Sequence, residues 1–131
     1  MIQIASTVYR EMAGYCFAQL PQEACGLLSA REGIVRTCWP IINQQQSNTS
    51  FAMDEAEVDS VLSEMERSGE QLAAIFHSHP TASARPSPFD IEQIVYPCSY
   101  IILSLAHQRT RIRSYVPLNK TLIPERILLI H

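Results

Sequence analysis

The chain has 131 residues, of which 47% are hydrophobic and 18% charged, and its formal net charge is −3. A chain of this length buries about two thirds of its unfolded surface, which excludes a disordered tail and a disulfide-stapled mini-protein. The basic residues are scattered along the chain. We therefore expect no nucleic acid partner, because phosphate binding needs a concentrated positive surface.

The first half of the chain predicts a helix, a hairpin and a second helix. Apolar residues at helical spacing predict a helix over residues 4–19, which Pro21 ends. Apolar runs over residues 24–30 and 34–42, joined by a short turn, predict two strands. After a polar loop, Asp54 is typical of a helix N-cap, with Glu57 completing a capping box and Gly69 ending the helix.

The second half predicts a buried strand, a third helix and further strands. Residues 72–76 form an apolar strand that runs into His77, and prolines keep residues 81–88 irregular. Ser87 and Pro88 are a strong start signal for a helix that stops at Pro97. Residues 100–105 and 111–116 predict two strands, and residues 121–130 a third, which Pro124 confines to its later residues or to a sheet edge.

This order of elements predicts an α/β sandwich. We expect a single domain over residues 1–131, with a central mixed β-sheet flanked by helices. No apolar run approaches the roughly 20 residues that span a bilayer, and the N-terminus lacks the features of a signal peptide. We therefore expect a cytoplasmic protein without a membrane partner, in which the four cysteines are buried as small hydrophobic side chains.

One segment carries metal-binding chemistry. An apolar strand that ends in His77-Ser78-His79 places both imidazoles on one face, because side chains alternate along a strand. Asp90 lies in the first turn of the next helix, which the proline-rich loop can fold back toward the strand end. Two imidazole nitrogens and one carboxylate oxygen leave a fourth position for water, as in a catalytic zinc site. Read separately, the segment is also a polar strand end followed by a helix capping pair, Ser87 and Asp90.

The combination resembles a known motif. His77-x-His79-Pro80, six residues, then Ser87-x-x-Asp90 is similar to the JAMM motif of the JAB/MPN metalloproteases. The segment from Pro21 to Leu28 looks like that family's glutamate followed by its first strand, with Glu23 in the place of the glutamate. Asn43 and residues 51–57 resemble the link into the family's second helix. The resemblance extends from about residue 4 to residue 116.

The resemblance implies a role for each matching residue. His77, His79 and Asp90 would be the ligands of one Zn²⁺ per chain, with water in the fourth position. Glu23 would be the general base that takes a proton from this water and returns it to the leaving amine. Ser87 would stabilise the oxyanion, provided that its hydroxyl is not fully consumed by the helix cap. The activity implied is hydrolysis of an amide or isopeptide bond without a covalent enzyme intermediate.

The resemblance also implies a class of substrate. The chain has little room beyond the family's core and looks like the compact prokaryotic members, which are associated with small ubiquitin-like or sulfur-carrier proteins ending in Gly-Gly. A diglycine tail is narrow enough to add along a strand edge and reach the metal. We therefore expect a zinc metallopeptidase that cleaves after such a tail. Apolar strands near the C-terminus are compatible with a homo-oligomer, but the sequence does not indicate how many chains it would contain.

Two other functions remain as alternatives. The first is a non-catalytic MPN module that binds partners as a scaffold, although such modules usually lack one or more of the ligands that are present here. The second is another zinc hydrolase, or a zinc deaminase, on a similar α/β sandwich. Zinc deaminases use His or Cys ligands with a Pro-Cys-x-x-Cys element. Pro97-Cys98 begins like that element but lacks its second cysteine. We expect His107 and His131 to be exposed bystanders, and Cys25 and Ser78 to be structural.

Overall fold

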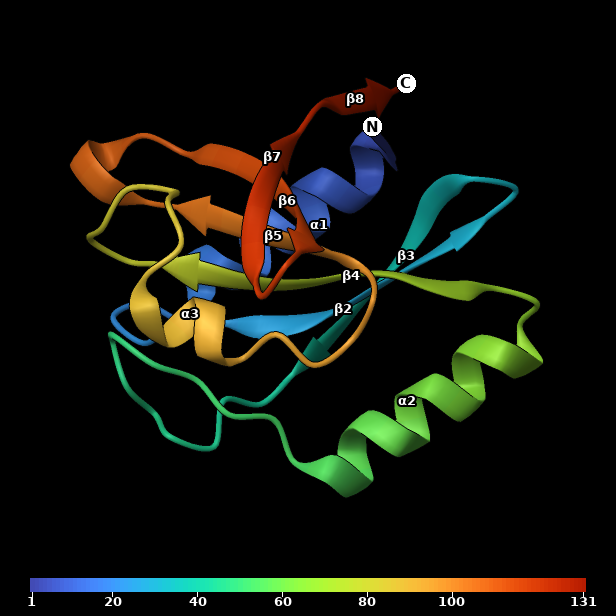
Figure 1. Ribbon diagram of the computed structural model, residues 1–131, viewed down its shortest axis with the longest axis horizontal. Coiled ribbons are helices and arrows are strands. Elements are labelled where there is room, and N and C mark those ends of the chain that lie inside the picture. The colour runs from blue at the N-terminus through green and yellow to red at the C-terminus, as the bar shows by residue number, and fades with distance from the viewer.

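Eight strands form one curled, mixed sheet in the computed structural model, which describes residues 1–131 (Figure 1). The strands are β1 (Ile2–Ala5), β2 (Cys25–Arg31), β3 (Ile34–Ile41), β4 (Gln71–His79), β5 (Ser99–Ser104), β6 (Arg111–Leu118), β7 (Thr121–Glu125) and β8 (Ile127–Ile130). The helices are α1 (Ser6–Ala18), α2 (Glu55–Arg67) and α3 (Pro88–Glu92), with a single 3-10 turn, η1 (Ala106–Gln108). The strand order is β7-β6-β5-β4-β2-β3-β1-β8.

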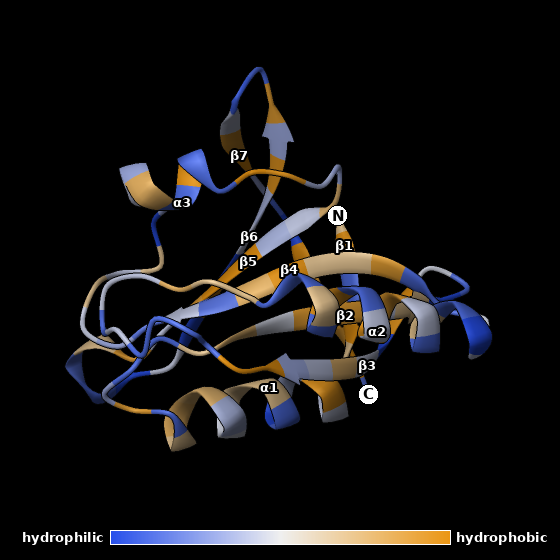
Figure 2. Cartoon of the chain, turned by 90° about the horizontal axis from the view of Figure 1, so that it is seen from below, coloured by the Kyte–Doolittle hydropathy of each residue, from blue (hydrophilic) through white to orange (hydrophobic).

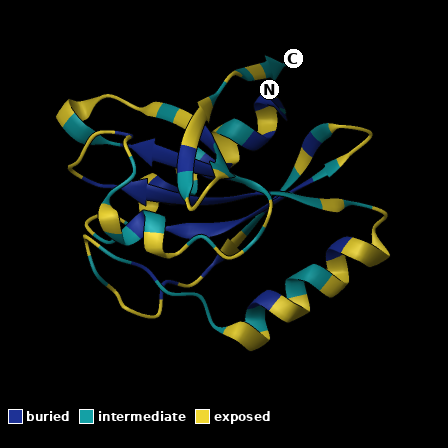
Figure 3. Ribbon diagram, viewed as in Figure 1, coloured by how far each residue is buried: buried dark blue, intermediate teal, exposed yellow.

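Helices cover both faces of this sheet, which confirms the predicted α/β sandwich. On one face, α1 packs its buried Val8 and Met12 against Leu28 and Phe76 of the sheet. On the other face, Val58 and Met65 of α2 pack with a second set of strand residues, Leu27, Ile75 and Ile102 among them. Figure 2 shows α1 and α3 on opposite sides of the sheet, and Figure 3 shows that the central strands are its most buried part. No helix in the structure has the length and apolar character needed to cross a bilayer.

The three central strands bring the predicted site residues to one end of the sheet. Strand β2 pairs antiparallel with β4, so that Cys25 lies opposite His77. Strand β5 pairs parallel with β4 on its other side, and His79 lies opposite Ser104. Gly26 is required in β2, because a Cβ at this position would overlap the ring of Phe76 and the backbone of β3. The close approach of β2 to β4 holds the segment just before β2 beside the histidines.

Two predicted helices differ from the structure. The prediction of a helix over residues 4–19 is wrong at its start, because Ile2–Ala5 form β1, which pairs in parallel with both β3 and β8. The strand alternation that buries both Ile2 and Ile4 outweighs the place of Ile4 in the helical pattern. The third helix does not reach Pro97 but ends at Glu92. The backbone N–H groups of Val95 and Tyr96 donate to the Tyr100 hydroxyl instead of continuing the helix.

The C-terminal segment contains two strands where one was expected. The chain leaves β7 at Glu125 and enters β8 at Ile127, and these strands form the opposite edges of the sheet. Pro124 lies in β7, an edge strand, as its missing N–H predicts. At α2, the N-cap is confirmed, since the Asp54 carboxylate accepts from the N–H of Glu57 at 3.0 Å. Gly69 follows this helix with the positive φ of a C-terminal glycine.

Candidate metal and hydrolytic site

The end of β4 presents two imidazoles side by side. His77 and His79 are two residues apart on the strand, and their Nε2 atoms are 3.2 Å apart. Both are buried, with 4% of their surface exposed. Ser78, between them, belongs to the opposite face, and its hydroxyl accepts from the N–H of Ala24 at 2.8 Å. Ser78 therefore links β4 by a hydrogen bond to the segment that carries Glu23.

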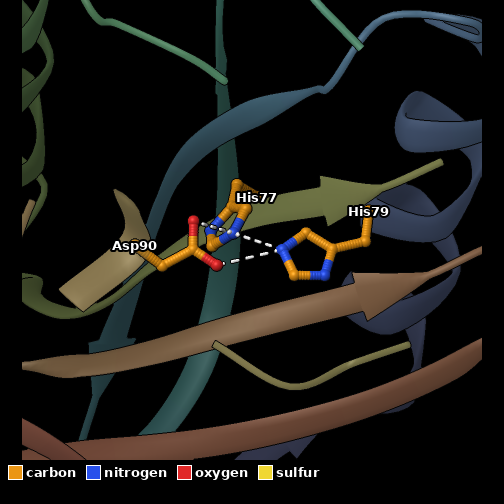
Figure 4. A group of neighbouring side chains, drawn as sticks. All are labelled: His77, His79 and Asp90. Atoms are coloured by element: carbon orange, nitrogen blue, oxygen red, sulfur yellow. Dashed lines mark hydrogen bonds and ion pairs between the residues drawn. The ribbon is translucent and has the colours of Figure 1, made fainter. Parts of the chain in front are cut away.

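Asp90 reaches both imidazoles from the first turn of α3 (Figure 4). Its Oδ1 lies 3.1 Å from Nε2 of His77, and its Oδ2 lies 3.0 Å from Nε2 of His79. A capping box holds the carboxylate in place, since the Ser87 N–H donates to Oδ2 at 2.9 Å. Potential ligand atoms of the three side chains lie within 4.8 Å of one another. The structure thus brings together the three residues that the motif predicts as metal ligands.

The charges of these three groups follow from their contacts. Burial alone would raise the pKa of Asp90, but hydrogen bonds from His77 and His79 hold it well below its ordinary value. Burial lowers the pKa of His77, which outweighs the influence of Asp90. Burial also acts to lower the pKa of His79, but hydrogen bonds to Asp90 and to the Ser83 carbonyl raise it overall. Asp90 is therefore a carboxylate between the two imidazoles.

The donor set fits a divalent metal ion. Two imidazole nitrogens and one carboxylate oxygen are typical of zinc, and other divalent transition metals accept the same set. His79 is oriented for this purpose, because its Nδ1–H donates to the Ser83 carbonyl at 2.6 Å and leaves Nε2 as the nitrogen that faces Asp90. A hydrogen bond of this kind fixes the tautomer of a metal-binding histidine. These residues can therefore hold such an ion.

Glu23 lies just before β2, with its backbone held and one carboxylate oxygen free. Its N–H donates to the Ser47 carbonyl at 2.7 Å, and its carbonyl accepts from the Asn43 side chain at 3.0 Å. The residue is 4% exposed, and its Oε1 is a buried side-chain atom without a hydrogen-bond partner. Burial raises the pKa of Glu23 to about 7; His79 opposes this shift and Asp90 adds to it. A buried carboxyl of this kind can gain or lose a proton near neutral pH.

The hydrogen bond of Ser87 decides whether the helix cap uses up its hydroxyl. Its Oγ accepts from the N–H of Asp90 at 3.1 Å, as an N-cap residue does. This bond uses a lone pair of the hydroxyl and leaves its hydrogen free to donate. The cap therefore does not consume the hydroxyl.

An apolar cavity of about 240 Å³ lies next to His77 and Asp90. The Phe51 ring stacks on the His77 imidazole, with centroids 4.7 Å apart and an interplanar angle of 23°. Sequence reasoning missed this wall, although residues 51–53 are an apolar stretch that ends a polar loop, which was the available signal. Residues from the loop before α2, from α2 and from β4 and β5 line the cavity, among them Phe51, Met53, Val58, Ile75 and Tyr100.

The residues expected to be bystanders lie apart from this chemistry. His107 and His131 are exposed. Cys25 is buried, and its thiol contacts the Ile41 carbonyl at 3.4 Å.

The Ser83 carbonyl and the Asn43 amide were not identified as parts of the site. A backbone carbonyl in an irregular loop has no sequence signature, and Asn43 was noted only for its place before α2.

Comparisons with known proteins agree with this geometry. The family model described as prokaryotic homologs of the JAB domain matches residues 5–116. The chain is 30% identical over 103 residues to a probable TtuB-protein conjugate cleaving protease of Thermus thermophilus, covering 78% of this chain and 69% of that protein. It is 29% identical over 119 residues to the CysO-cysteine peptidase of Mycobacterium tuberculosis, covering 88% of this chain and 82% of that protein.

The fold has a close counterpart among solved structures. The solution structure of a protein from Desulfitobacterium hafniense superposes with a TM-score of 0.89 at 34% identity, over 99% of this chain and 93% of that one. The family match covers most of the chain, including β2, β4 and α3, which carry or adjoin the candidate site. The resemblance read from the motif is confirmed, and the chain belongs to the prokaryotic JAB domain family.

Proposed function

We propose that the chain is a zinc-dependent peptidase that hydrolyses the amide or isopeptide bond after the C-terminal Gly-Gly of a small ubiquitin-like or sulfur-carrier protein. One observation carries this proposal. Glu23 is a buried carboxyl with an unpartnered oxygen, and it lies close enough to the cluster of His77, His79 and Asp90 for their charges to shift its pKa. Such an orphaned polar atom is costly in a folded protein and is common where a group acts in a reaction.

The proposed roles follow from the contacts of each side chain. His77, His79 and Asp90 would hold one zinc ion, which supplies Lewis acidity toward a carbonyl and toward water. Glu23 would accept a proton during attack on the scissile bond and return it to the leaving amine, which suits a pKa near 7. The free hydroxyl hydrogen of Ser87 would donate to the oxygen on which negative charge develops.

The substrate class has support from the relatives and from the cavity. One relative is named as a protease that cleaves conjugates of TtuB with proteins, and another as a peptidase of CysO-cysteine. We infer a related kind of conjugate for this chain. The cavity beside His77 and Asp90 is lined mostly by apolar side chains. A surface of this kind favours a peptide tail over a strongly charged small molecule.

The test is a matched set of carrier substrates. A carrier protein ending in Gly-Gly is joined either to cysteine through a peptide bond or to a lysine side chain through an isopeptide bond, and release is followed by mass spectrometry. We expect the zinc-loaded chain to cleave at least one of the two, and a substrate ending in Ala-Ala to be cleaved much more slowly. The pair also identifies the group that is released.

The control is Glu23→Gln, which keeps the shape of the side chain but cannot accept the proton. We expect about 10²–10⁴-fold slower hydrolysis with unchanged zinc content. Equal rates for this variant and the wild type would remove Glu23 from the mechanism. If every Gly-Gly substrate stays intact while zinc is bound, the peptidase proposal fails and the non-catalytic module takes its place.

A further inference from the structure

Three consecutive carbonyls in the loop between β4 and α3 are each held by a buried side chain. The Ala82 carbonyl accepts from the Ser104 hydroxyl, the Ser83 carbonyl from His79 Nδ1, and the Ala84 carbonyl from the Tyr115 hydroxyl, each at 2.6 Å. Their donors come from the adjacent strands β4, β5 and β6. None of the donor residues is more than 4% exposed.

These side-chain hydrogen bonds hold the loop in place, as backbone hydrogen bonds do in a helix or a strand. Residues 81–86 make no backbone–backbone hydrogen bond. Prolines at positions 80 and 86 remove backbone donors at both ends of this stretch. The position of the Ser83 carbonyl therefore depends on the flanking bonds from Ser104 and Tyr115. It is the only one of the three carbonyls that contacts a candidate metal ligand.

We propose that Tyr115 and Ser104 are positioning residues of the metal site, acting on His79 through the Ser83 carbonyl. A carbonyl only accepts, so it keeps the proton of a neutral His79 on Nδ1 and the lone pair on Nε2. If the loop shifts, the imidazole can rotate or change tautomer, and the triad loses one aligned nitrogen. The inference rests on the proposed metal site and is independent of the proposed substrate.

The decisive variant is Tyr115→Phe, which removes one hydroxyl and keeps the buried ring. We expect zinc affinity, measured by competition with a chelating dye, to fall about 10-fold or more. Ser104→Ala changes the neighbouring bond and is expected to weaken zinc in the same direction. It also keeps the inference testable if Tyr115→Phe does not fold.

Matched controls separate positioning from general loosening of the core. Tyr15→Phe removes a tyrosine hydroxyl of α1, which donates to the Ile41 carbonyl at 3.2 Å and contacts no candidate ligand. Ser114→Ala removes a buried serine hydroxyl that donates to Glu125 at 2.8 Å. We expect both controls to keep the zinc affinity of the wild type, even where they lower the melting temperature as much.

A second readout needs neither metal nor substrate. Imidazole ¹⁵N chemical shifts of the metal-free protein, at a pH where the ring is neutral, report which nitrogen of His79 carries the proton. We expect the Nδ1–H form to be a larger fraction of the wild type than of Tyr115→Phe, because the Asp90 carboxylate competes for the proton through Nε2. Unchanged tautomer and affinity in both loop variants, or equal losses in the controls, would overturn the inference. Absence of zinc binding by the wild type would instead overturn the proposed function.

Discussion

The two halves of the candidate site are held in opposite ways. On the ligand side, both oxygens of Asp90 and both nitrogens of His79 are engaged by neighbouring groups. On the other side, Glu23 is fastened through its backbone, by Ser47 and Asn43, while its Oε1 meets no partner. In the first half these side-chain nitrogens and oxygens all have partners, whereas the second half is fixed in position but leaves one carboxylate oxygen without a hydrogen bond.

This difference suits two kinds of chemistry. Ligands gain from being fixed before an ion arrives, because binding then costs little reorganisation. A proton carrier needs a side chain whose partners change during the reaction, and a permanent hydrogen bond would tie it to one state. The unpartnered oxygen of Glu23 lowers the stability of the fold, and we interpret that cost as a sign of function.

The largest effect is expected when the ligand side is broken. Asp90→Ala removes one ligand and the contact that aligns both imidazoles. Elemental analysis should find about one zinc per wild-type chain and little or none in the variant, with hydrolysis abolished. Asp54→Ala is the control, because it also removes a carboxylate from the start of a helix. That variant should lose about 1 kcal/mol of stability and no zinc. Full zinc content in Asp90→Ala would mean that Asp90 is not a ligand.

The next effect concerns the hydroxyl at the border of the two halves. Ser87→Ala removes the proposed oxyanion donor and should lower kcat about 10²–10³-fold at saturating zinc. Ser87→Thr keeps both the cap and the donor, and the extended backbone at this position accepts a branched side chain. We expect it to recover most of the rate. If the threonine variant is as slow as the alanine variant, Ser87 acts through packing and not as a donor.

The pH dependence of the unfolding free energy measures how much the buried, ionised Glu23 carboxylate destabilises the fold. The folded metal-free protein holds the Glu23 proton with a pKa of about 7, against an ordinary value of 4.5. The extra affinity of the folded state for this proton stabilises the fold fully at pH values below the ordinary pKa of 4.5, and this stabilisation is lost as the pH rises to about 7. Between these limits, the unfolding free energy of the wild type should fall by up to about 3 kcal/mol relative to Glu23→Gln.

Urea titrations in the presence of EDTA, at a series of pH values, check this expectation. Glu66→Gln, on the exposed surface of α2, controls for the loss of one negative charge. Parallel stability curves for the wild type and Glu23→Gln from pH 4 to 8 would show that the Glu23 carboxyl is not held in its neutral form by the fold.

The smallest effect tests how Glu23 is positioned. The Asn43 amide donates to the carbonyls of Glu23 and Ser50, and its oxygen accepts from two backbone N–H groups. Asn43→Ala should cost about 1–3 kcal/mol, since buried carbonyls lose their partner. It should slow hydrolysis while zinc affinity stays that of the wild type, the reverse of Tyr115→Phe. A loss of zinc affinity here would show that the two halves are not held independently.

Some of this organisation could be predicted from local patterns and some could not. Alternation along β4 predicted that His77 and His79 share a face, and the cap at Ser87 predicted that Asp90 starts a helix, because both are short-range signals. That the three residues form one site was implied by the resemblance to the JAMM motif. The cap of α2 at Asp54 was readable for the same reason. The stacking of Phe51 on His77 depends on a contact between distant segments, which no pattern along the chain records. The hold of Tyr115 on the Ala84 carbonyl is of the same kind.

The errors in the fold have a similar origin. Residues 4 and 5 were included in the predicted helix, but pairing with β3 and β8, which are far away in the chain, places them in a strand. Ile94 and Val95 also continue the pattern of the third helix, yet the Tyr100 hydroxyl takes the N–H of Val95. At β1 a tertiary contact decides between conformations that are close in local preference, and after α3 a side-chain hydrogen bond from five residues along the chain decides.

The bonds between Ala24 and Ser78 have a consequence for the order of folding. His79 and Asp90 are 11 residues apart, whereas Ala24 and Ser78, which bring Glu23 to the site, are 54 residues apart. Closing the short loop costs less entropy, so we expect the ligands to gather before β2 docks on β4. A chain that is still folding would therefore have the candidate ligands together before Glu23, the proposed base, joins them. Hydrolysis is expected to appear last, once the native sheet is complete.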